Sequence, residues 1–344
     1  MAMINSNRVA GLALAVIATL SWALNFIAPY VTGAYSIYDL MVIRFLVAGA
    51  LGAGILVIGR VQLRSLSGHQ QLLGASLGLV GYLGYSACIA AGVMFGGPVL
   101  TPAFIGMVPV LLALLSNTLS HTVAWRRLTI PLMLLTLGLV LSNISSLHAP
   151  AVNQRSWPVA LVLSVSAVGL WLVFSVLNQR ALKTLPDNAS GVWTGLMITG
   201  AGMGAVCLIP VLLGLDLIKL ATLGFSVRAA GHLYAWGLLI GVMCSCVAAW
   251  AWNAASERLP MVLSGQLIAL ESLFATLFGL LFQRRLPTPL EAAGMAAVLL
   301  GVVMAVRAIV TSSPEGQAKR EPTRHYHPPP QASPPPPPTG RRQC

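Results

Sequence analysis

One carboxylate stands out because of the residues that surround it. Glu271 is the only charged residue in the stretch LSGQLIALESLFATLFGLLF, residues 263–282, and it lies near the middle. An ionisable group at the centre of a membrane helix costs about 2.5–3.5 kcal/mol on insertion scales, so such a residue faces protein or water rather than lipid. Burial favours the neutral form of a carboxyl group, which makes proton exchange near neutral pH feasible. Glu271 is therefore a candidate site for a proton or a cationic solute. The alternative is a structural glutamate that is paired with an arginine or with neighbouring hydrogen-bond donors.

A cation occupies a comparable position earlier in the chain. Arg44 lies about two turns into the apolar run 38–58, five residues after Asp39, a spacing that does not suit a local pair on a helix. Its guanidinium could pair with Glu271, bind a substrate carboxylate, or extend along its own stem towards the membrane interface. We expect a structural or gating role first, and contact with substrate second.

Aromatic and amide side chains form a third group of candidates. Transport cavities are commonly lined by aromatic rings with a few placed polar groups, although interfacial belts use the same residues. Tyr82 and Tyr85 share a helix face, and the same spacing applies to Trp22 and Asn25. Asn253 could line a cavity or join helices through hydrogen bonds. Substrate or coupling residues are therefore expected among Glu271, Arg44, Trp22, Asn25, Tyr82, Tyr85, Trp252, Asn253 and Ser264.

The composition indicates which solvent surrounds these residues. The chain of 344 residues is 57% hydrophobic and 8% charged, whereas soluble domains carry about 25% charged residues. So few charges cannot cover a water-facing surface, which makes a lipid bilayer the expected partner. Ten apolar runs approach the roughly 20 residues that a spanning helix needs. They lie near residues 10–29, 38–58, 71–94, 99–119, 129–147, 158–177, 190–213, 232–255, 261–282 and 290–310. The sequence thus predicts an all-α polytopic membrane protein with about ten transmembrane helices.

The net charge of +12 is interpreted as topology rather than as a sign of nucleic-acid binding. Lys and Arg collect in cytoplasmic loops. With the N-terminus inside, nine basic residues outside the C-terminal tail fall on the cytoplasmic side and five on the other. Because ten is an even number, both termini are expected in the cytoplasm. The five cysteines form no CxxC or Cys/His cluster, so neither a metal nor a cofactor is expected.

The two halves of the chain resemble each other. Aligning Pro98 with Pro260 puts Pro109 opposite Glu271, and the alignment continues past both helices without a gap. Five helices per half is an odd number, so the second copy must enter the membrane the other way up. Inverted repeats of this kind are typical of secondary transporters, whose substrate site lies near the midplane between the repeats.

The chain ends differ from the helical part. Residues 1–9 are expected to form a short cytoplasmic segment. Residues 311–344 are polar, proline-rich and basic, and such a composition cannot bury enough apolar surface to fold. Their proline run could bind an SH3-like groove, but a solvated tail without a protein partner is the preferred interpretation.

The pieces LSWALNF, IRFLVAGALGAG, MVPVLLALLS, AAWAWNAASERLP and LIALESLFATLFGLLF, followed by LEAAGMAAVLLGVVM, carry a resemblance to a known family. In this order they resemble the EamA-type transporters of the drug/metabolite transporter superfamily, and more so its bacterial inner-membrane members that keep the acid in helix nine. The resemblance covers about residues 10–310. It implies two inverted EamA repeats, residues 10–147 and 158–310, in a multi-pass protein of the bacterial inner membrane.

The expected function is secondary transport by alternating access. The resemblance implies export of a small metabolite, such as an amino acid or a similar amphipathic solute, with protons coupled through Glu271 as one possibility. A passive channel or membrane partner would need a continuous polar pore lining, which the sequence does not suggest. An intramembrane enzyme would need clustered His, Asp or Ser, which the sequence does not suggest, and HExxH does not occur in it.

Overall fold

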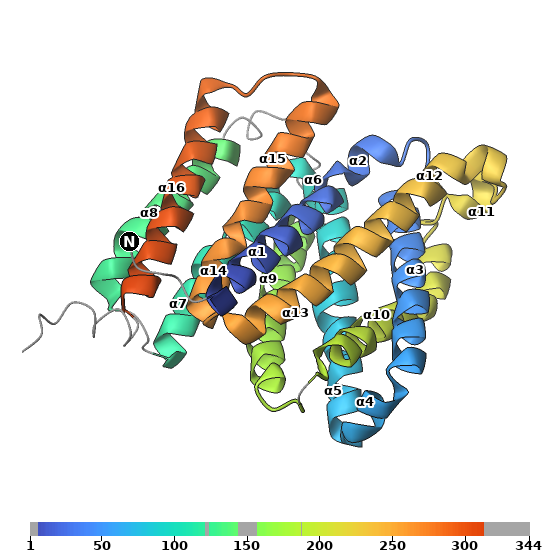
Figure 1. The fold of residues 1–344 in the computed structure, drawn as a ribbon. Helices are drawn as coiled ribbons and strands as arrows, with labels where there is room; N and C mark the ends of the chain where they lie inside the picture. The colour runs from blue at the N-terminus through green and yellow to red at the C-terminus, as the bar shows by residue number, and fades with distance from the viewer. Residues whose placement is uncertain (1–5, 121–123, 144–156, 187, 313–344) are drawn as a thin grey trace, which may run out of the picture.

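The computed structural model describes residues 6–120, 124–143, 157–186 and 188–312, and all the regular structure in this part of the chain is helical (Figure 1). The predicted tail from residue 313 onward and residues 1–5 of the predicted N-terminal segment lie outside it. The elements are α1 (Ser6–Ala23), η1 (Leu24–Ile27), α2 (Ala28–Val31), α3 (Ile37–Ile58), α4 (Arg60–Ser65), α5 (Gly68–Gly78), η2 (Leu79–Gly84), α6 (Tyr85–Gly106), α7 (Val108–Ser120), α8 (Trp125–Asn143), α9 (Trp157–Leu182), α10 (Ser190–Gly214), α11 (Leu220–Leu223), α12 (Val227–Ile240), η5 (Gly241–Val247), α13 (Ala248–Arg258), α14 (Met261–Leu267), α15 (Ala269–Gln283) and α16 (Pro289–Ser312).

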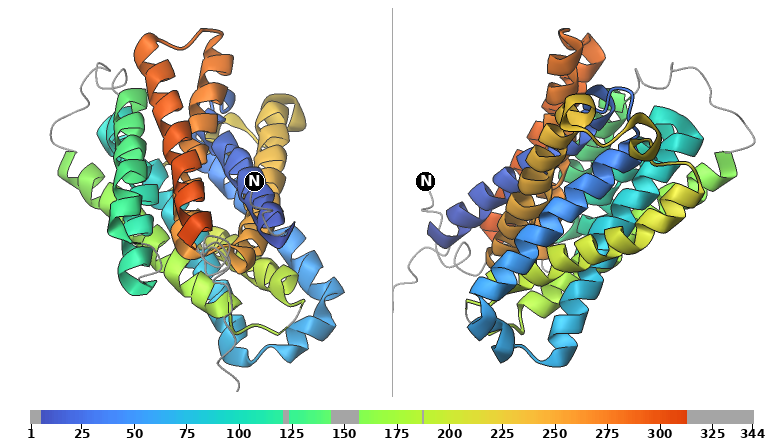
Figure 2. Two further views of the ribbon diagram at one scale, coloured as in Figure 1. Left: turned by 60° about the vertical axis from the view of Figure 1, so that its left-hand side comes forward. Right: turned by 90° about the vertical axis from the view of Figure 1, so that its right-hand side faces the viewer.

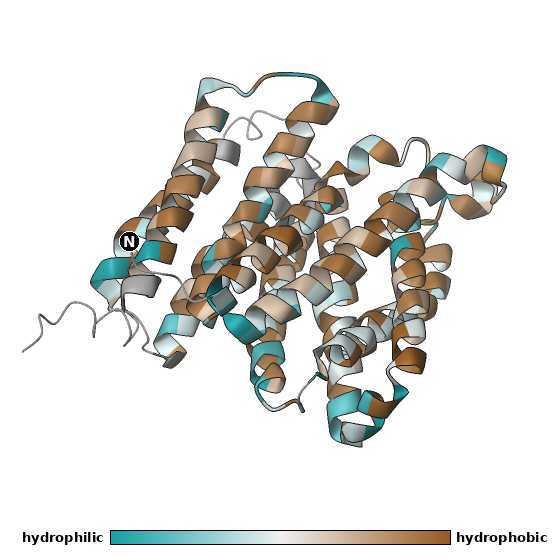
Figure 3. Cartoon of the chain, in the orientation of Figure 1, coloured by the Kyte–Doolittle hydropathy of each residue, from teal (hydrophilic) through white to brown (hydrophobic). Residues whose placement is uncertain are grey.

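The helices have the length and surface that a membrane requires. Within the described residues, eight are long and apolar enough to cross a bilayer. The shorter apolar helix Phe104–Leu119 and α8 fall at the remaining two predicted spans. Apolar residues cover the outer faces of the helices, and hydrophilic residues gather near the ends (Figure 3). An exposed apolar surface of this extent is unfavourable in water and matches lipid, so the prediction of an all-helical polytopic membrane protein is confirmed.

Two of the predicted spans meet inside one helical element. The helix α6 runs from Tyr85 to Gly106 without an assigned break. However, a Cβ added to Gly92 would lie 2.6 Å from the Thr101 hydroxyl oxygen, whereas nine residues of straight helix extend about 13.5 Å. The chain must therefore reverse between these residues, which agrees with the boundary predicted between runs 71–94 and 99–119.

Close glycine contacts hold several helices together. Helix α10 lies between α3 and α5. A Cβ on Gly49 of α3 would lie 2.9 Å from the Gly202 Cα of α10, and one on Gly78 of α5 would overlap the Met197 carbonyl group. On the opposite side of the molecule, α8 packs along α16 (Figure 2). Small residues let backbones approach this closely where no hydrophobic effect drives the helices together.

The molecule has two ends. The short helices α2 and α11 and the connection between α15 and α16 lie at one of them, called the first end (Figure 1). The second end carries α4 and the turn at Pro260 between α13 and α14. Arg285 lies at the first end. It is one of the five basic residues that the predicted topology places on the non-cytoplasmic side. It donates hydrogen bonds of 2.7 Å to both carboxylate oxygens of Glu291, and these bonds raise the pKa of the guanidinium group.

A buried aspartate fastens the first end. Asp39, with no exposed surface, accepts hydrogen bonds from the backbone N–H groups of Ser36, Lys219 and Leu220, at 2.8, 3.0 and 3.1 Å. The Ser36 hydroxyl donates to the Leu217 carbonyl oxygen at 2.7 Å. One carboxylate thus caps α3 and also holds the connection that leads into α11.

Four of the spanning helices are interrupted near the middle of the bundle. A 3₁₀ turn, η1, interrupts the first helix, and the π-helical turns η2 and η5 interrupt two others. The fourth interruption, at Ile268, separates α14 from α15. In the alignment that puts Pro98 opposite Pro260, Leu79 at the start of η2 falls opposite Gly241 at the start of η5. Turns of this kind are common at functional sites.

Candidate functional site

The four interruptions surround a central cavity of about 130 Å³. At about 30 Å³ of liquid volume for each water, this volume holds about four water molecules, which suits a small organic solute. The cavity lies nearer to the first end, because α3 contributes only its initial turns. Six of the nine residues predicted from the sequence line it: Glu271, Arg44, Trp22, Asn25, Tyr82 and Tyr85.

Interrupted helices place the polar side chains. Asn25 lies within η1, Tyr82 within η2, and Ser245 within η5. The interruption at Ile268 puts Glu271 in the first turn of α15. The N-terminal turn of a helix carries a partial positive charge, so it favours a carboxylate at that position.

Arg44 is held from two sides. Its Nε donates to the Ser245 hydroxyl oxygen at 2.8 Å, and its Nη1 donates to the Asn25 side-chain oxygen at 2.7 Å. The guanidinium carbon also lies 4.5 Å from the centre of the Phe45 ring, close enough for a cation–π contact. These two bonds use only two of the five N–H donors of an arginine, so the others are available to a bound anion.

Glu271 and Arg44 line the same cavity without forming an ion pair. The ion pairs found in the described residues are Lys219–Asp216, Arg258–Glu257 and Arg285–Glu291. In the described part of the chain, the Glu271 carboxylate has no hydrogen-bond partner either. Its charge and that of Arg44 interact through space. A carboxylate without a partner can accept a proton or the cationic group of a ligand.

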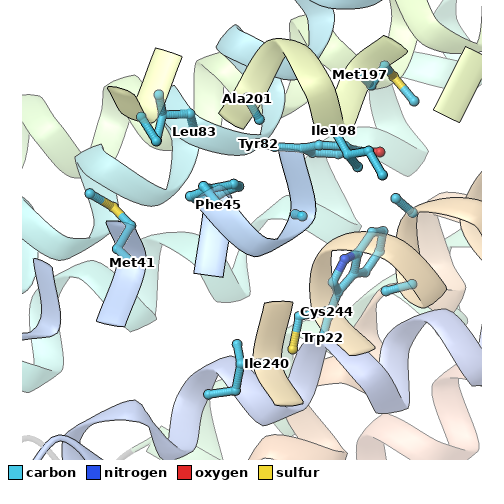
Figure 4. Packing of buried hydrophobic residues seen from close by; sticks show 14 of the residues in the cluster. Trp22, Met41, Phe45, Tyr82, Leu83, Met197, Ile198, Ala201, Ile240 and Cys244 are labelled. Atoms are coloured by element: carbon cyan, nitrogen blue, oxygen red, sulfur yellow. The ribbon is translucent and has the colours of Figure 1, made fainter. Parts of the chain in front are cut away.

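Aromatic rings close the cavity on the side that faces the second end. The ring centres of Trp22 and Trp171 lie 5.2 Å apart, and those of Tyr85 and Trp171 lie 4.9 Å apart. Figure 4 shows Trp22 next to Cys244, whose thiol donates to the Ser21 carbonyl oxygen at 2.9 Å. The Tyr82 hydroxyl and the Trp171 ring nitrogen are buried without a hydrogen-bond partner in the described part of the chain. The cavity wall therefore combines flat apolar faces with polar groups that are not fully bonded.

Three predicted residues lie outside the cavity lining. Trp252 is buried, and its ring centre lies 5.3 Å from that of Trp22. Asn253 is buried in a hydrogen-bonded network with Asn178 and Thr194. Ser264 belongs to α14, on the other side of the interruption from Glu271, and does not line the cavity.

The nine expected residues did not include Ser245 or Trp171, which also line the cavity. Ser245 lies in the run MCSCV, where nothing distinguishes it from the neighbouring small residues. A π-helical turn shifts the register of the side chains that follow it, so helical periodicity could not have placed this hydroxyl beside Arg44. Trp171 lies at a depth in helix 157–182 that is similar to the depth of Trp22 in its own helix. This match could have identified Trp171 as a cavity residue.

Among the described residues, no group of three or more His, Cys, Asp or Glu side chains is arranged to hold a metal ion. The cavity contains one carboxylate and no histidine, a poor donor set for the common protein-bound cations.

Fold and cavity together define a polytopic helical membrane protein with a central polar site. No family model matches the chain. It is 30% identical over 311 residues to the inner membrane protein YtfF of Escherichia coli (strain K12), and the match covers 87% of this chain and 96% of YtfF. The chain therefore belongs to the family of YtfF and is a multi-pass protein of the inner membrane, which confirms the predicted location. A solved crystal structure shares the fold, with a TM-score of 0.69 and 20% identity, over 89% of this chain and 99% of that one.

Proposed function

We propose that this protein is a secondary transporter of the EamA type that moves a small organic solute out of the cell by alternating access. One observation carries the proposal. Glu271 and Arg44, two opposite charges inside the helical bundle, line one cavity and are not paired with each other in the described residues. Intramembrane charges of this kind mark substrate and ion pathways.

The cavity supports a substrate with both an acidic and a basic group. The free N–H donors of Arg44 suit a carboxylate, and Glu271 suits an ammonium group. The rings of Trp22, Tyr85 and Trp171 offer flat apolar contacts for the remainder of the solute, and a cation–π contact for its ammonium group. With room for about four waters, a small amino acid or a solute of similar size fits these requirements.

Proton coupling follows from the same arrangement. When the solute leaves, Glu271 has no cation in contact, and an isolated charge in a poorly solvated site is unfavourable. A proton that binds at this point neutralises the carboxylate and is released when the next ammonium group arrives. The solute and the proton would thus use the same carboxylate in turn, which couples their movements.

The internal correspondence of the interruptions supports two inverted repeats. The π-helical turns η2 and η5 fall at matching positions in the alignment of the halves, and each contributes to the cavity. Interrupted helices at the contact between two repeats are a feature of secondary transporters. Such a design supplies the two related conformations that alternating access needs.

The test uses purified protein in proteoliposomes with an internal and external panel of amino acids, nucleosides and cationic drugs. We first measure which class raises the thermal unfolding midpoint with concentration, since a ligand that binds the folded state does so. Counterflow of the labelled compound is then measured for the wild type, Glu271→Gln and Ser264→Ala. We expect saturable exchange of an amino acid in the wild type and Ser264→Ala, and little in Glu271→Gln. Flux that rises linearly with concentration would indicate a channel, and a chemically altered compound would indicate an enzyme.

A further inference from the structure

A second hollow lies at the second end of the molecule. It has a volume of about 520 Å³ and forms where α9 and α13 end and α14 begins. Its polar lining comes mainly from Gln179, Arg180, Lys183, Ser256, Glu257 and Arg258. Three cations against one carboxylate give this cleft a positive charge, which attracts solutes that carry an anionic group.

The cleft and the central cavity approach each other closely along α9. Trp171 lines the cavity and Val176 lines the cleft. Five residues of helix correspond to about 7.5 Å. A second helical segment, formed by η5 and α13, runs from Ser245 at the cavity to Ser256 at the cleft. Two helices thus border both hollows, and we take the side chains packed between these helices as the layer that separates the hollows.

Two kinds of contact make up this layer. Trp22 meets Trp252, with ring centres 5.3 Å apart. Next to them the Asn178 amide donates to the Asn253 side-chain oxygen at 2.8 Å, and Asn253 donates to the Thr194 hydroxyl at 2.8 Å. Asn178 and Asn253 have at most 1% of their surface exposed. These two side chains of the layer are therefore closed to water in this conformation.

The layer can open without leaving unpaired polar groups. The amides of Asn178 and Asn253 can exchange their mutual hydrogen bond for bonds to water or to a passing solute, and the net cost of such an exchange is small. The Ser175 hydroxyl, which lies about one helical turn before Asn178 on α9, is buried without a partner in the described residues and would gain one. A layer of apolar side chains alone would offer a polar solute no hydrogen bonds during its passage.

We propose that the cleft is the second access of the transport path, for a solute with an anionic group, and that the Trp22–Trp252 contact and the Asn178–Asn253 hydrogen bond are the gate between cleft and cavity. This inference rests on the proposed transport function. The gate is closed in the conformation described, in which the cavity lies nearer to the first end.

The test measures access to the cavity independently of transport. In a chain whose five cysteines are replaced by serine, Ser86→Cys places a thiol in the cavity, and Arg64→Cys on α4 marks the second end. Right-side-out and inside-out vesicles are treated with a membrane-impermeant maleimide. We expect Ser86→Cys to react slowly in the vesicles that expose the second end, and about tenfold faster when Asn253→Ala is added.

The matched control is Ser164→Ala, which removes the buried 2.9 Å hydrogen bond between Thr101 and Ser164, away from both hollows. It should leave the labelling rate unchanged. Equal labelling from the second end in Asn253→Ala and Ser164→Ala would overturn the gate.

A cross-link provides a second test if Asn253→Ala does not fold. In Asn178→Cys/Asn253→Cys, oxidation to a disulfide should keep the gate closed, so that solute still binds from the first end but exchange stops until a reductant is added. Exchange at the wild-type rate in the oxidised protein would overturn the gate. If the reduced protein also shows no exchange while the labelling pattern holds, the transport proposal fails and the gate remains.

Replacing both Arg180 and Lys183 with glutamine should slow solute entry from the second end only, and an unchanged rate would overturn the anionic class.

Discussion

Two groups of buried polar side chains lie within the helical bundle, and they differ in how their bonds are completed. In the first, Trp193 donates to Asn178, Asn178 donates to Asn253, and Asn253 donates to Thr194, each at 2.8 Å. In the second, around Glu271 and the cavity, the carboxylate has no partner among the described residues. Both groups sit in apolar surroundings, where an unpaired polar group is costly.

The difference separates polar residues whose hydrogen bonds join helices from polar residues that keep unused bonding capacity for a ligand. The asparagine network links α9, α10 and α13, and its side chains satisfy one another. Residues around the cavity keep unused bonding capacity, which a solute, a proton or water must complete. Removing a member of the first group should therefore lower stability and loosen the proposed gate, whereas removing Glu271 or a hydrogen-bond partner of Arg44 should weaken solute binding and transport.

The largest expected effect is on transport in Glu271→Gln. A hydrogen bond to a charged group contributes about 1.5–3 kcal/mol, so counterflow should fall about 10- to 100-fold and lose its pH dependence. Stability should not fall, because the amide has the same shape and needs no counterion. Counterflow at several pH values and thermal unfolding check both parts. The control is Asp216→Asn, at an exposed carboxylate on the first end. An unchanged pH profile in Glu271→Gln would contradict the coupling role.

The second effect is on stability in Asn253→Ala. This change removes the bonds to Asn178 and Thr194, and interhelical bonds of this kind average about 0.6 kcal/mol, up to about 1.7. We expect the free energy of unfolding in detergent to fall by about 1–3 kcal/mol, while solute affinity from the first end stays constant. Thr199→Val is the matched control, because the Thr199 hydroxyl is buried without a partner in the described residues. Equal losses in the two variants would remove the distinction between paired and unpaired groups.

A smaller effect is expected in Ser245→Ala, which removes one of the two hydrogen-bond partners of Arg44. A bond worth about 1 kcal/mol corresponds to roughly a fivefold loss of solute affinity, with the maximal rate nearly unchanged. Saturation curves for counterflow separate the two quantities. Ser86→Ala takes a hydroxyl from the same cavity without touching Arg44 and should behave as the wild type. A drop in the maximal rate alone would mean that Ser245 does not act through Arg44.

The smallest effect is expected in Ser264→Ala. Within the described part of the chain, this hydroxyl donates one hydrogen bond, to the Pro260 carbonyl oxygen at 3.5 Å, and it lies outside the cavity. Both unfolding free energy and counterflow should stay within error of the wild type, with a change below about 0.5 kcal/mol. A loss of transport here would show that α14 contributes to the solute path despite the interruption at Ile268.

Much of the fold could be predicted because a bilayer demands long apolar helices. The ten predicted runs match helices of the structure, and the reversal between Gly92 and Thr101 falls at a predicted boundary. The interruptions at η2, η5 and Ile268 could not be predicted, because uniformly apolar sequence does not distinguish a π-helical turn from a regular one. The inverted repeat remains a prediction, which the matching positions of η2 and η5 support.

Part of the candidate site could be predicted from the sequence for the same reason. Glu271 and Arg44 were conspicuous as charges in apolar runs, and the structure brings both to one cavity. For Trp252 and Asn253, residue type could not separate a cavity wall from helix packing, and the structure places both in the packing between the hollows. Ser245 depended on the register shift at η5, which periodicity does not encode.

The bonds of Asp39 join residues that are made at different times. Ser36 is three positions away, whereas Lys219 is 180 positions further along the chain. At about 5–20 residues per second, a ribosome needs roughly 10–40 s to cover that distance. During this interval the newly inserted helix α3 carries its carboxylate with the local cap as partner, and the second half of the chain supplies the remaining donors. The hydrogen bonds of Asp39 at the first end are therefore completed late in biosynthesis, by residues that have not yet been translated when α3 enters the membrane.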